Sequence, residues 1–327
     1  MKVLVTGGAG YIGSTVANLL IDKGYEVTIF DNLSTGNIKN IPKNAYFYKI
    51  DISNTKKTIK IFKEKKFDIV FHFAAFINNE ESLKNPKKYY VNNYLKGKKF
   101  FENCIKYKIN KFIYSSTAAA YGNKKSKVSE KGKLKPLSPY PKSKLKLENF
   151  LIRNKKKISC IILRYFNVAG VDKKMRCGFS VKNDYNLILN LCSSLNEKKT
   201  FIINGNDYNT IDGTPVRDYI HVIDLANIHF LVSKLVLKKK LLKIFNCGYG
   251  YGYSVKQILD KFNTITNKKI KYKIGKRRSS DIVVSIANPN NLKKITGWKP
   301  KFDNLKKILK SSLNWYLKNT KSTKITD

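Results

Sequence analysis

The feature that most restricts the fold of this chain is a glycine-rich turn between a strand-like segment and a helix-like segment. The turn, TGGAGYIG at residues 6–13, follows the apolar residues 2–5 and precedes residues 14–20, whose apolar positions have helical spacing. In such a turn, backbone N–H groups can approach a pyrophosphate at the positive end of a helix. The pattern therefore predicts a dinucleotide-binding βαβ unit.

The second half of this unit indicates which dinucleotide binds. Gly24 ends the predicted helix, and residues 25–31 form a second predicted strand that ends in Asp31. An acidic side chain at about this distance from the glycines binds the ribose hydroxyls of adenosine and repels a 2′-phosphate. We therefore expect NAD rather than NADP. The alternative is a tight turn followed by an ordinary strand-end aspartate.

Strand-like and helix-length segments alternate through the first half of the chain. Residues 67–73, 111–116 and 158–164 are the further predicted strands. This alternation predicts an α/β protein with a Rossmann-type, doubly wound parallel sheet at residues 1–170, to which segments near 205–238 return. Residues 171–320 are expected to form a smaller C-terminal α/β substrate lobe, with helices near 184–197, 224–238, 254–266 and 303–318, and residues 321–327 a tail.

The strongly basic composition raises the question of nucleic-acid binding. The chain has 65 lysines and arginines against 22 acidic residues, a net charge of +43. Only six of these residues are arginine, which is the preferred residue for bidentate phosphate and base contacts, and the lysines are spread over the whole length. We therefore expect solvated lysine-rich faces and no specific nucleic-acid partner, although the charge can accelerate the approach of anionic substrates.

Cysteine spacing and hydropathy exclude several other classes. The five cysteines are far apart and never form a C-x-x-C pair, so neither a disulfide framework nor a metal site is predicted. No segment approaches the ~18 consecutive apolar residues of a membrane span, and the N-terminus shows no signal-peptide pattern. A cytoplasmic protein with no membrane partner is expected.

A tyrosine and a lysine with helical spacing form the candidate catalytic pair. Tyr140 and Lys144 are four residues apart, in a helix predicted to begin near Pro141, so they lie on one face. An ammonium group beside a phenol stabilises the phenolate and lowers the phenol pKa from about 10, which allows it to act as a base. Upstream, the hydroxyls of residues 115–117 follow a strand and could bind a reacting oxygen. Chance pairing in a lysine-rich chain is the alternative.

Taken together, these motifs resemble the extended short-chain dehydrogenase/reductases, and within them the UDP-glucose 4-epimerases, over nearly the full length. The matching segments occur in the family's order: TGGAGYIGS at 6–14, DNLSTG at 31–36, HFAA at 72–75, ES at 81–82, NN at 92–93, SSTAAAYG at 115–122, Y-x-x-S-K at 140–144, RYFNVAG at 164–170 and GNDYNTIDGTPVRDYIHVIDLA at 205–226. The last segment is long and therefore discriminating.

The resemblance implies roles for individual residues. The residues expected to bind NAD are Gly7, Gly10, Tyr11, Ile12, Gly13, Asp31, Asn32, Leu33, Ser34, Thr35, Gly36, Asp51, Ile52, Phe73, Ala74, Ala75, Phe76, Ile77, Asn93, Tyr140, Lys144 and Phe166. Those expected to contact a UDP-sugar are Asn167, Asn186, Leu187, Arg217, Tyr219, Arg278, Asp281 and Ser285. Thr117 occupies the position of the family's catalytic serine or threonine. Family members are typically dimers, so a homodimer is expected.

The resemblance also implies a reaction. Tyr140 as phenolate would remove the proton of the sugar 4-hydroxyl while C4 passes a hydride to NAD, which produces a 4-keto sugar. This sugar would turn over and take the hydride back on its other face, so that C4 is inverted. Among related activities, a 4,6-dehydratase would need acidic residues where Ala118 and Ala119 stand. A UDP-glucuronate epimerase or decarboxylase, a non-catalytic NAD-sensing protein and a nucleic-acid-binding protein remain as alternatives.

Several positions depart from the family pattern. Pro141 replaces a glycine after the tyrosine, and proline suits a first helical turn. Ile77 replaces a lysine expected near the nicotinamide phosphates, and Ser280 replaces the glycine of an R-x-G-D motif. Ser285 stands where members restricted to glucose and galactose have tyrosine, and a small side chain there leaves room for an acetamido group. We therefore expect UDP-GlcNAc and UDP-GalNAc to be substrates as well.

Overall fold

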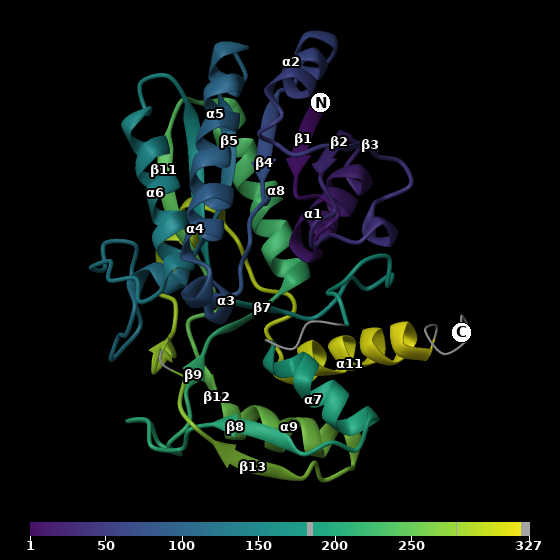
Figure 1. Cartoon of the computed structure of the whole chain (residues 1–327), viewed down its shortest axis with the longest axis vertical. Helices are drawn as coiled ribbons and strands as arrows, with labels where there is room; N and C mark the ends of the chain where they lie inside the picture. The colour runs from purple at the N-terminus through teal and green to yellow at the C-terminus, as the bar shows by residue number, and fades with distance from the viewer. Residues whose placement is uncertain (182–185, 279, 322–327) are drawn as a thin grey trace.

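A seven-stranded parallel sheet forms the centre of the molecule in the computed structural model, which describes residues 1–181, 186–278 and 280–321 (Figure 1). Its strand order is β11-β6-β5-β4-β1-β2-β3, and every neighbouring pair runs parallel. The strands are β1 (Lys2–Thr6), β2 (Glu26–Asp31), β3 (Tyr46–Lys49), β4 (Ile69–His72), β5 (Lys111–Thr117), β6 (Ser159–Tyr165) and β11 (Leu242–Cys247). The predicted Rossmann-type sheet is confirmed.

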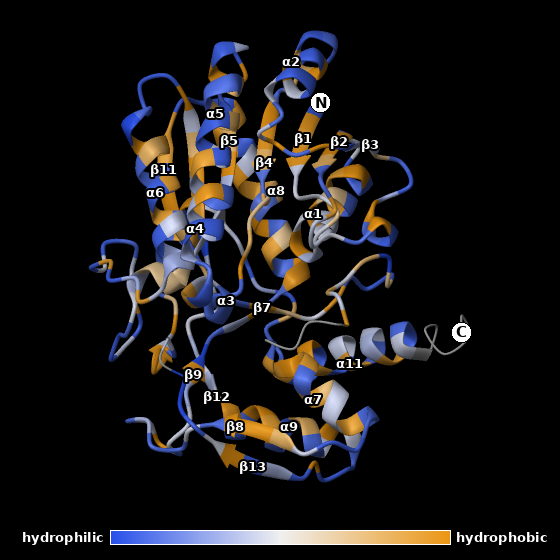
Figure 2. Cartoon of the chain, viewed as in Figure 1, coloured by the Kyte–Doolittle hydropathy of each residue, from blue (hydrophilic) through white to orange (hydrophobic). Residues whose placement is uncertain are grey.

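Helices cover both faces of this sheet, which explains why its inner strands are apolar and buried along most of their length (Figure 2). Val3 and Val5 of β1 belong to one core cluster, together with residues of α1 and α8, whereas Leu4 belongs to the opposite cluster. The helices are α1 (Tyr11–Asp22), α2 (Thr55–Glu64), α3 (Asn79–Lys84), α4 (Pro86–Tyr89), α5 (Gly97–Lys106), α6 (Pro139–Arg153) and α8 (Val222–Lys238), with the 3-10 turns η1 (Ile38–Asn40) and η3 (Ala118–Tyr121) and the π-helix η2 (Tyr90–Lys96).

The strand order reverses next to β1. From β1 the chain proceeds outward through β2 and β3, whereas β4, β5 and β6 follow on the other side. Ligands of open α/β sheets bind outside the carboxyl ends of the strands at such a reversal. The glycine turn directly follows β1, so it lies at this position.

A smaller layer lies below the sheet in Figure 1 and contains α7 (Leu187–Asn196), β8 (Phe201–Asn204), β9 (Val216–Arg217), β12 (Tyr253–Ser254), α9 (Val255–Thr266), β13 (Tyr272–Gly275) and α11 (Leu305–Lys321). The remaining strands are β7 (Asn167–Ala169), which pairs with β10 (Tyr219–His221), and β14 (Val284–Ser285), which pairs with β9. Helix α10 (Asn290–Thr296) packs against β11. The four later helices occur close to their predicted ranges. Residues 184–185 of the first range and 322–327 of the predicted tail lie outside the described residues.

Two segments from the second half of the chain belong to the sheet layer. Helix α8 packs against α1, and β11 extends the sheet beyond β6. The returning segment is therefore 222–247, whereas residues 205–217 lie outside the sheet. No helix within the described ranges is long and apolar enough to cross a membrane.

Candidate active site

The glycine turn is packed so tightly that side chains are excluded at two of its positions. Gly7 has a φ of 72°, and a Cβ there would lie 2.6 Å from the backbone nitrogen of Ala74. A Cβ on Gly13 would lie 2.2 Å from the carbonyl oxygen of Gly7. Gly10 begins α1 as its N-cap, with no side chain to cover the N–H groups of the first turn. This arrangement fits a pyrophosphate at the start of α1.

Asp31 joins the glycine turn to the loop after β2. Its side chain is largely buried, and its carboxylate accepts hydrogen bonds from the backbone N–H groups of Ala9 at 3.0 Å and Leu33 at 2.8 Å. Burial raises the pKa of this carboxyl, and the two N–H groups oppose the shift. A Cβ on Gly36 would lie 3.0 Å from Asp31 Oδ1. The structure thus brings residues 31–36 to the glycine turn.

Asp51 and Ile52 follow β3 at the same edge of the sheet. Asp51 pairs with Lys96 at 2.6 Å and accepts a hydrogen bond from Asn32 Nδ2 at 3.2 Å. Although partial burial raises the pKa of Asp51, Lys96 and Ser53 outweigh it and lower the pKa to about 2. Lys96 was not predicted from the sequence, because its contact with Asp51 depends on the π-helix η2 reaching the same edge.

A single asparagine fixes the segment that follows β4. Asn93 is buried in η2, and its Oδ1 accepts from Phe76 N at 2.8 Å while its Nδ2 donates to Phe76 O at 2.9 Å and to Ser143 Oγ at 3.1 Å. Residues 73–76 therefore stand between the glycine turn and α6. Ile77, at the position where a lysine was expected, is 54% exposed.

Helix α6 carries the candidate catalytic pair, and Pro141 occupies its first turn as expected. Lys144 is 3% exposed, and its Nζ donates to Ser115 Oγ at 3.3 Å and lies 4.6 Å from the centre of the Tyr114 ring. Burial lowers the pKa of Lys144 to about 7, and the charge of Glu148 opposes this shift. Tyr140 is half-buried, with its ring centre 6.4 Å from that of Tyr89.

Thr117 ends β5 beside this pair. Its side chain is buried, and its Oγ1 accepts a hydrogen bond from Ala119 N at 3.2 Å, which begins the turn η3. Thr117 pairs with Tyr165 of β6 in the sheet, and the buried side chain of Phe166 follows directly. Hydroxyl groups of Ser115 and Thr117 therefore reach the carboxyl edge of the sheet together with Lys144.

Two arginines outside the sheet were predicted to contact a UDP-sugar. Arg217 Nη1 donates to the carbonyl oxygens of Val216 at 3.0 Å and Val283 at 3.3 Å, and burial lowers the pKa of its guanidinium while Asp281 opposes this shift. Arg278 pairs with Glu80 of α3 at 2.9 Å. Glu80 was not predicted, and this ion pair joins α3 to the smaller layer.

The other predicted substrate residues occupy different elements. Ser285 stands opposite Arg217 in the β14–β9 pair, and Tyr219 stands opposite Asn167 in the β10–β7 pair. Asp281 accepts a hydrogen bond from the Tyr208 hydroxyl at 3.0 Å. Asn186 caps α7, accepting from the N–H groups of Ile188 and Leu189, and Leu187 begins that helix.

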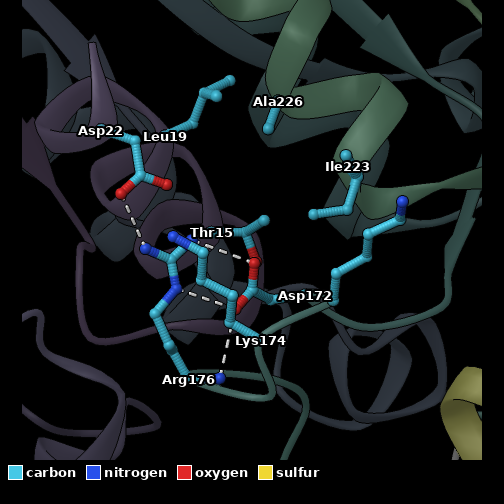
Figure 3. Close-up of a pocket in the computed structure, with 9 residues that line it drawn as sticks. Thr15, Leu19, Asp22, Asp172, Lys174, Arg176, Ile223 and Ala226 are labelled. Atoms are coloured by element: carbon cyan, nitrogen blue, oxygen red, sulfur yellow. Dashed lines mark hydrogen bonds and ion pairs between the residues drawn. The ribbon is translucent and has the colours of Figure 1, made fainter.

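A cavity of about 170 Å³ lies elsewhere, between α1, α8 and residues 172–176 (Figure 3). Arg176 lines the cavity, and its guanidinium group pairs with the carboxylates of Asp172 at 2.9 Å and Asp22 at 3.0 Å. None of the predicted site residues lines this cavity. It is therefore separate from the site built on the glycine turn.

Comparison with known proteins identifies the family. The model of the NAD dependent epimerase/dehydratase family matches residues 3–248. The chain belongs to this family. It is 37% identical to a UDP-glucose 4-epimerase of Lactobacillus helveticus over 98% of both chains.

Solved structures agree with this assignment. A UDP-glucose 4-epimerase from Bifidobacterium longum, in complex with NAD+ and UDP, is 32% identical with a TM-score of 0.92, covering 98% of this chain and 99% of that one. A UDP-Glc/GlcNAc 4-epimerase from Campylobacter jejuni is 36% identical with a TM-score of 0.83, covering 97% and 99%.

Membership of the NAD-dependent epimerase/dehydratase family confirms three predictions. The resemblance inferred from the motifs is correct, NAD is the cofactor of the family, and the chain is an enzyme of the epimerase type. Sequence reasoning missed Lys96, which pairs with Asp51, and Glu80, which pairs with Arg278. It also missed Glu148, whose charge acts on Lys144 from one helical turn away. No local motif marks these residues.

Proposed function

We propose that this chain inverts C4 of UDP-glucose and UDP-galactose. The observation that carries the proposal is the Tyr140–Lys144 pair: Lys144 is buried beside Ser115, at the edge of the sheet that also holds the glycine turn. The 4-epimerase relatives cover 98% of the chain, so the same activity is the simplest assignment. The alternative related activities have no comparable support.

The cofactor site consists of the glycine turn, residues 31–36, Asp51 and Ile52, the segment 73–77, Asn93 and Phe166. The turn's close backbone packing and the uncapped start of α1 fit a pyrophosphate, and Asp31 stands at the end of β2 where a ribose would lie. NAD, when bound there, supplies the hydride acceptor and donor for C4. Asn93 holds the segment 73–77 in place through both backbone groups of Phe76.

The chain's own residues handle the proton. Tyr140 takes the proton of the sugar 4-hydroxyl and later returns it, and Lys144 stabilises the phenolate through its positive charge. Thr117 and Ser115 place hydroxyl groups beside the reacting oxygen. Lys144 itself is buried, so little water screens its ammonium group, which strengthens its attraction for a phenolate.

The substrate's UDP group is assigned to the lobe at 171–320. Arg217 and Arg278 are suited to a diphosphate, because guanidinium groups form paired hydrogen bonds with phosphate oxygens. Glu80 pairs with Arg278, so its carboxylate would compete with a bound diphosphate for this guanidinium. The other proposed contacts of the UDP-sugar are Asn167, Asn186, Leu187, Tyr219 and Asp281.

N-acetylated UDP-sugars are proposed as second substrates. Ser285 is a small, half-buried residue beside Arg217, so an acetamido group would meet little side-chain volume there. The UDP-Glc/GlcNAc 4-epimerase of Campylobacter jejuni, 36% identical, supports this extension.

A homodimer is also proposed, with η2 and α6 at the interface. These packed helices expose apolar side chains: Tyr90 and Leu95 are exposed, and Tyr94 and Phe150 are half-buried. Contiguous apolar residues on outer helices mark association surfaces. The expected C2 interface would bring the same helices of two copies together.

The reaction is tested with Tyr140→Phe, which removes the phenol oxygen and retains the ring. Conversion of UDP-galactose is expected to fall by about 10²–10⁴-fold, while the bound NAD content stays at the parent level. Tyr46→Phe, an exposed change on β3, is the matched control. Parent-like turnover by Tyr140→Phe would refute the proposed base. Offering UDP-GlcNAc in the same assay tests the second substrate class, which fails if no product forms while UDP-galactose is converted.

A further inference from the structure

A buried ion pair lies directly behind the candidate catalytic helix face. Glu148 follows Lys144 by one helical turn on α6, and its Oε2 lies 2.7 Å from Nη2 of Arg164 on β6 while its Oε1 accepts from Arg164 Nε at 3.1 Å. The two side chains are 0% and 3% exposed. The Ser116 hydroxyl donates a further hydrogen bond to the same carboxylate. Buried ion pairs add little net stability because desolvation is costly, so this pair calls for another explanation.

The two side chains of this pair interact with different neighbours. Arg164 Nη1 donates to the Tyr121 hydroxyl at 2.9 Å, and that hydroxyl donates to Asn246 Oδ1 at 2.7 Å. These contacts hold the guanidinium toward η3 and β11. The Glu148 carboxylate, in contrast, acts on Lys144 as the charge that favours its ammonium form.

The buried histidines, phenols and thiols described around this part of α6 are neutral near pH 7. Burial lowers the pKa of His72 to about 3 and that of His229 to about 4, and it raises the pKa of each phenol and thiol. The phenols and thiols are Tyr114, Tyr121, Tyr165, Cys104 and Cys160. Within this described set, Glu148 therefore supplies the negative charge.

Lys144 needs such a charge because it is itself buried. Burial favours the neutral amine, and a neutral amine would give the Tyr140 phenolate no counter-charge. We propose that Glu148 is a positioning residue, which holds the end of β5 through Ser116 and keeps Lys144 as an ammonium beside Tyr140. This role deepens and rests on the proposed function, since it presupposes Tyr140 as the base.

The test is Glu148→Gln, which keeps the shape and removes the charge. The proposal makes Tyr140 and Lys144 a coupled pair, in which loss of a nearby negative charge lowers both apparent pKa values, whichever group loses its proton first. A shift of about one unit is expected. Tyrosinate absorbance, measured as the difference between each protein and its Tyr140→Phe counterpart, reports the shift without any substrate. The pH profile of kcat should move to lower pH by the same amount.

Ser116→Ala is the matched control, because it removes one hydrogen bond to Glu148 and leaves the charge. Its titration midpoints are expected to stay at the parent values. Should Glu148→Gln leave Arg164 unpaired and fail to fold, the double variant Glu148→Gln/Arg164→Gln removes both charges, and a smaller shift in the same direction is expected.

Unchanged midpoints in the folded Glu148→Gln or double variant, with activity reduced equally at every pH, would show a merely structural role and overturn the proposal. If the parent itself shows no tyrosinate difference from Tyr140→Phe below pH 10, the base assignment fails as well. The two failures are thereby distinguished.

Discussion

Replacement of Gly13 by alanine tests whether the glycine turn is fixed by packing or only by its ligand. Gly13 is the third residue of α1, and an added Cβ would lie 2.2 Å from the Gly7 carbonyl oxygen, whereas real Cβ atoms essentially never come within 3.0 Å of another heavy atom. The two groups must therefore separate by about 0.8 Å, the difference between these distances. Gly7 cannot move freely, because its N–H donates to Phe30 O at 2.8 Å and its Cα faces the backbone of Ala74.

The cost follows from these contacts. Overpacking against fixed backbone costs about 2 kcal/mol. Loss of the Gly10 N–H to Gly7 O hydrogen bond, now 3.2 Å, adds about 1 kcal/mol. The gain in helix propensity from glycine to alanine offsets about 1 kcal/mol. Gly13→Ala should therefore lower the free energy of unfolding by about 2 kcal/mol, or roughly 30-fold in the folding equilibrium.

Urea unfolding of the NAD-free protein, followed by circular dichroism, measures this change. Gly10→Ala is the matched variant in the same turn, because its Cβ would meet only Gly7 O, at 3.2 Å. It should cost well under 1 kcal/mol in stability while weakening NAD binding, since its Cβ would project at the uncapped start of α1. Equal stability of Gly13→Ala and the parent, or equal destabilisation by both variants, would refute the packing argument.

Three further predictions concern charge and specificity. Glu80→Gln should tighten UDP binding severalfold, as measured by calorimetry, because Arg278 loses its competing carboxylate. The control Glu102→Gln on α5 removes a carboxylate that pairs with Lys98 and should leave UDP affinity unchanged. Unchanged affinity in both variants would contradict the competition. Ser285→Tyr should abolish conversion of UDP-GlcNAc and retain that of UDP-galactose; equal loss of both would contradict a size filter. The imidazole NMR signals of His72, His221 and His229 should not titrate between pH 8 and 5, because burial lowers their pKa values to about 3 or 4. The stability that depends on the neutral rings is fully present above about pH 6.5, the pKa of an unfolded histidine, and is lost as the pH falls below it. Titration near pH 6.5 would contradict the burial of these rings.

Local signals in the sequence predicted the sheet well where they were strong. The first strand, the glycine turn and α1 form one continuous pattern, and the structure has them within three residues of the predicted ranges. Strand β3 was missed because it is a short edge strand of only four residues, whose side chains are all at least partly exposed. Strand β11 was missed because it begins among lysines and joins the sheet only by pairing with β6.

The candidate site was predictable only as far as motifs extend. The spacing of Tyr140 and Lys144 is visible along the chain, but the burial of Lys144 is a property of the packed sheet. The pairing of Lys96 with Asp51 depends on an unusual π-helix, and that of Arg278 with Glu80 depends on how two distant segments meet. Such contacts have no periodic signature, because the tertiary fold alone brings their partners together.

The path of the chain between its layers limits how this enzyme can be divided. After β6 the chain leaves the sheet, returns for α8 and β11, and leaves again for β12 and α9. A cut near residue 170 would remove the partner of α1 and expose the hydrogen-bonding edge of β6. Substrate preference could therefore not be exchanged between relatives by grafting a C-terminal cassette. A chimera would need three junctions, one near residue 170 and one on either side of the segment 222–247.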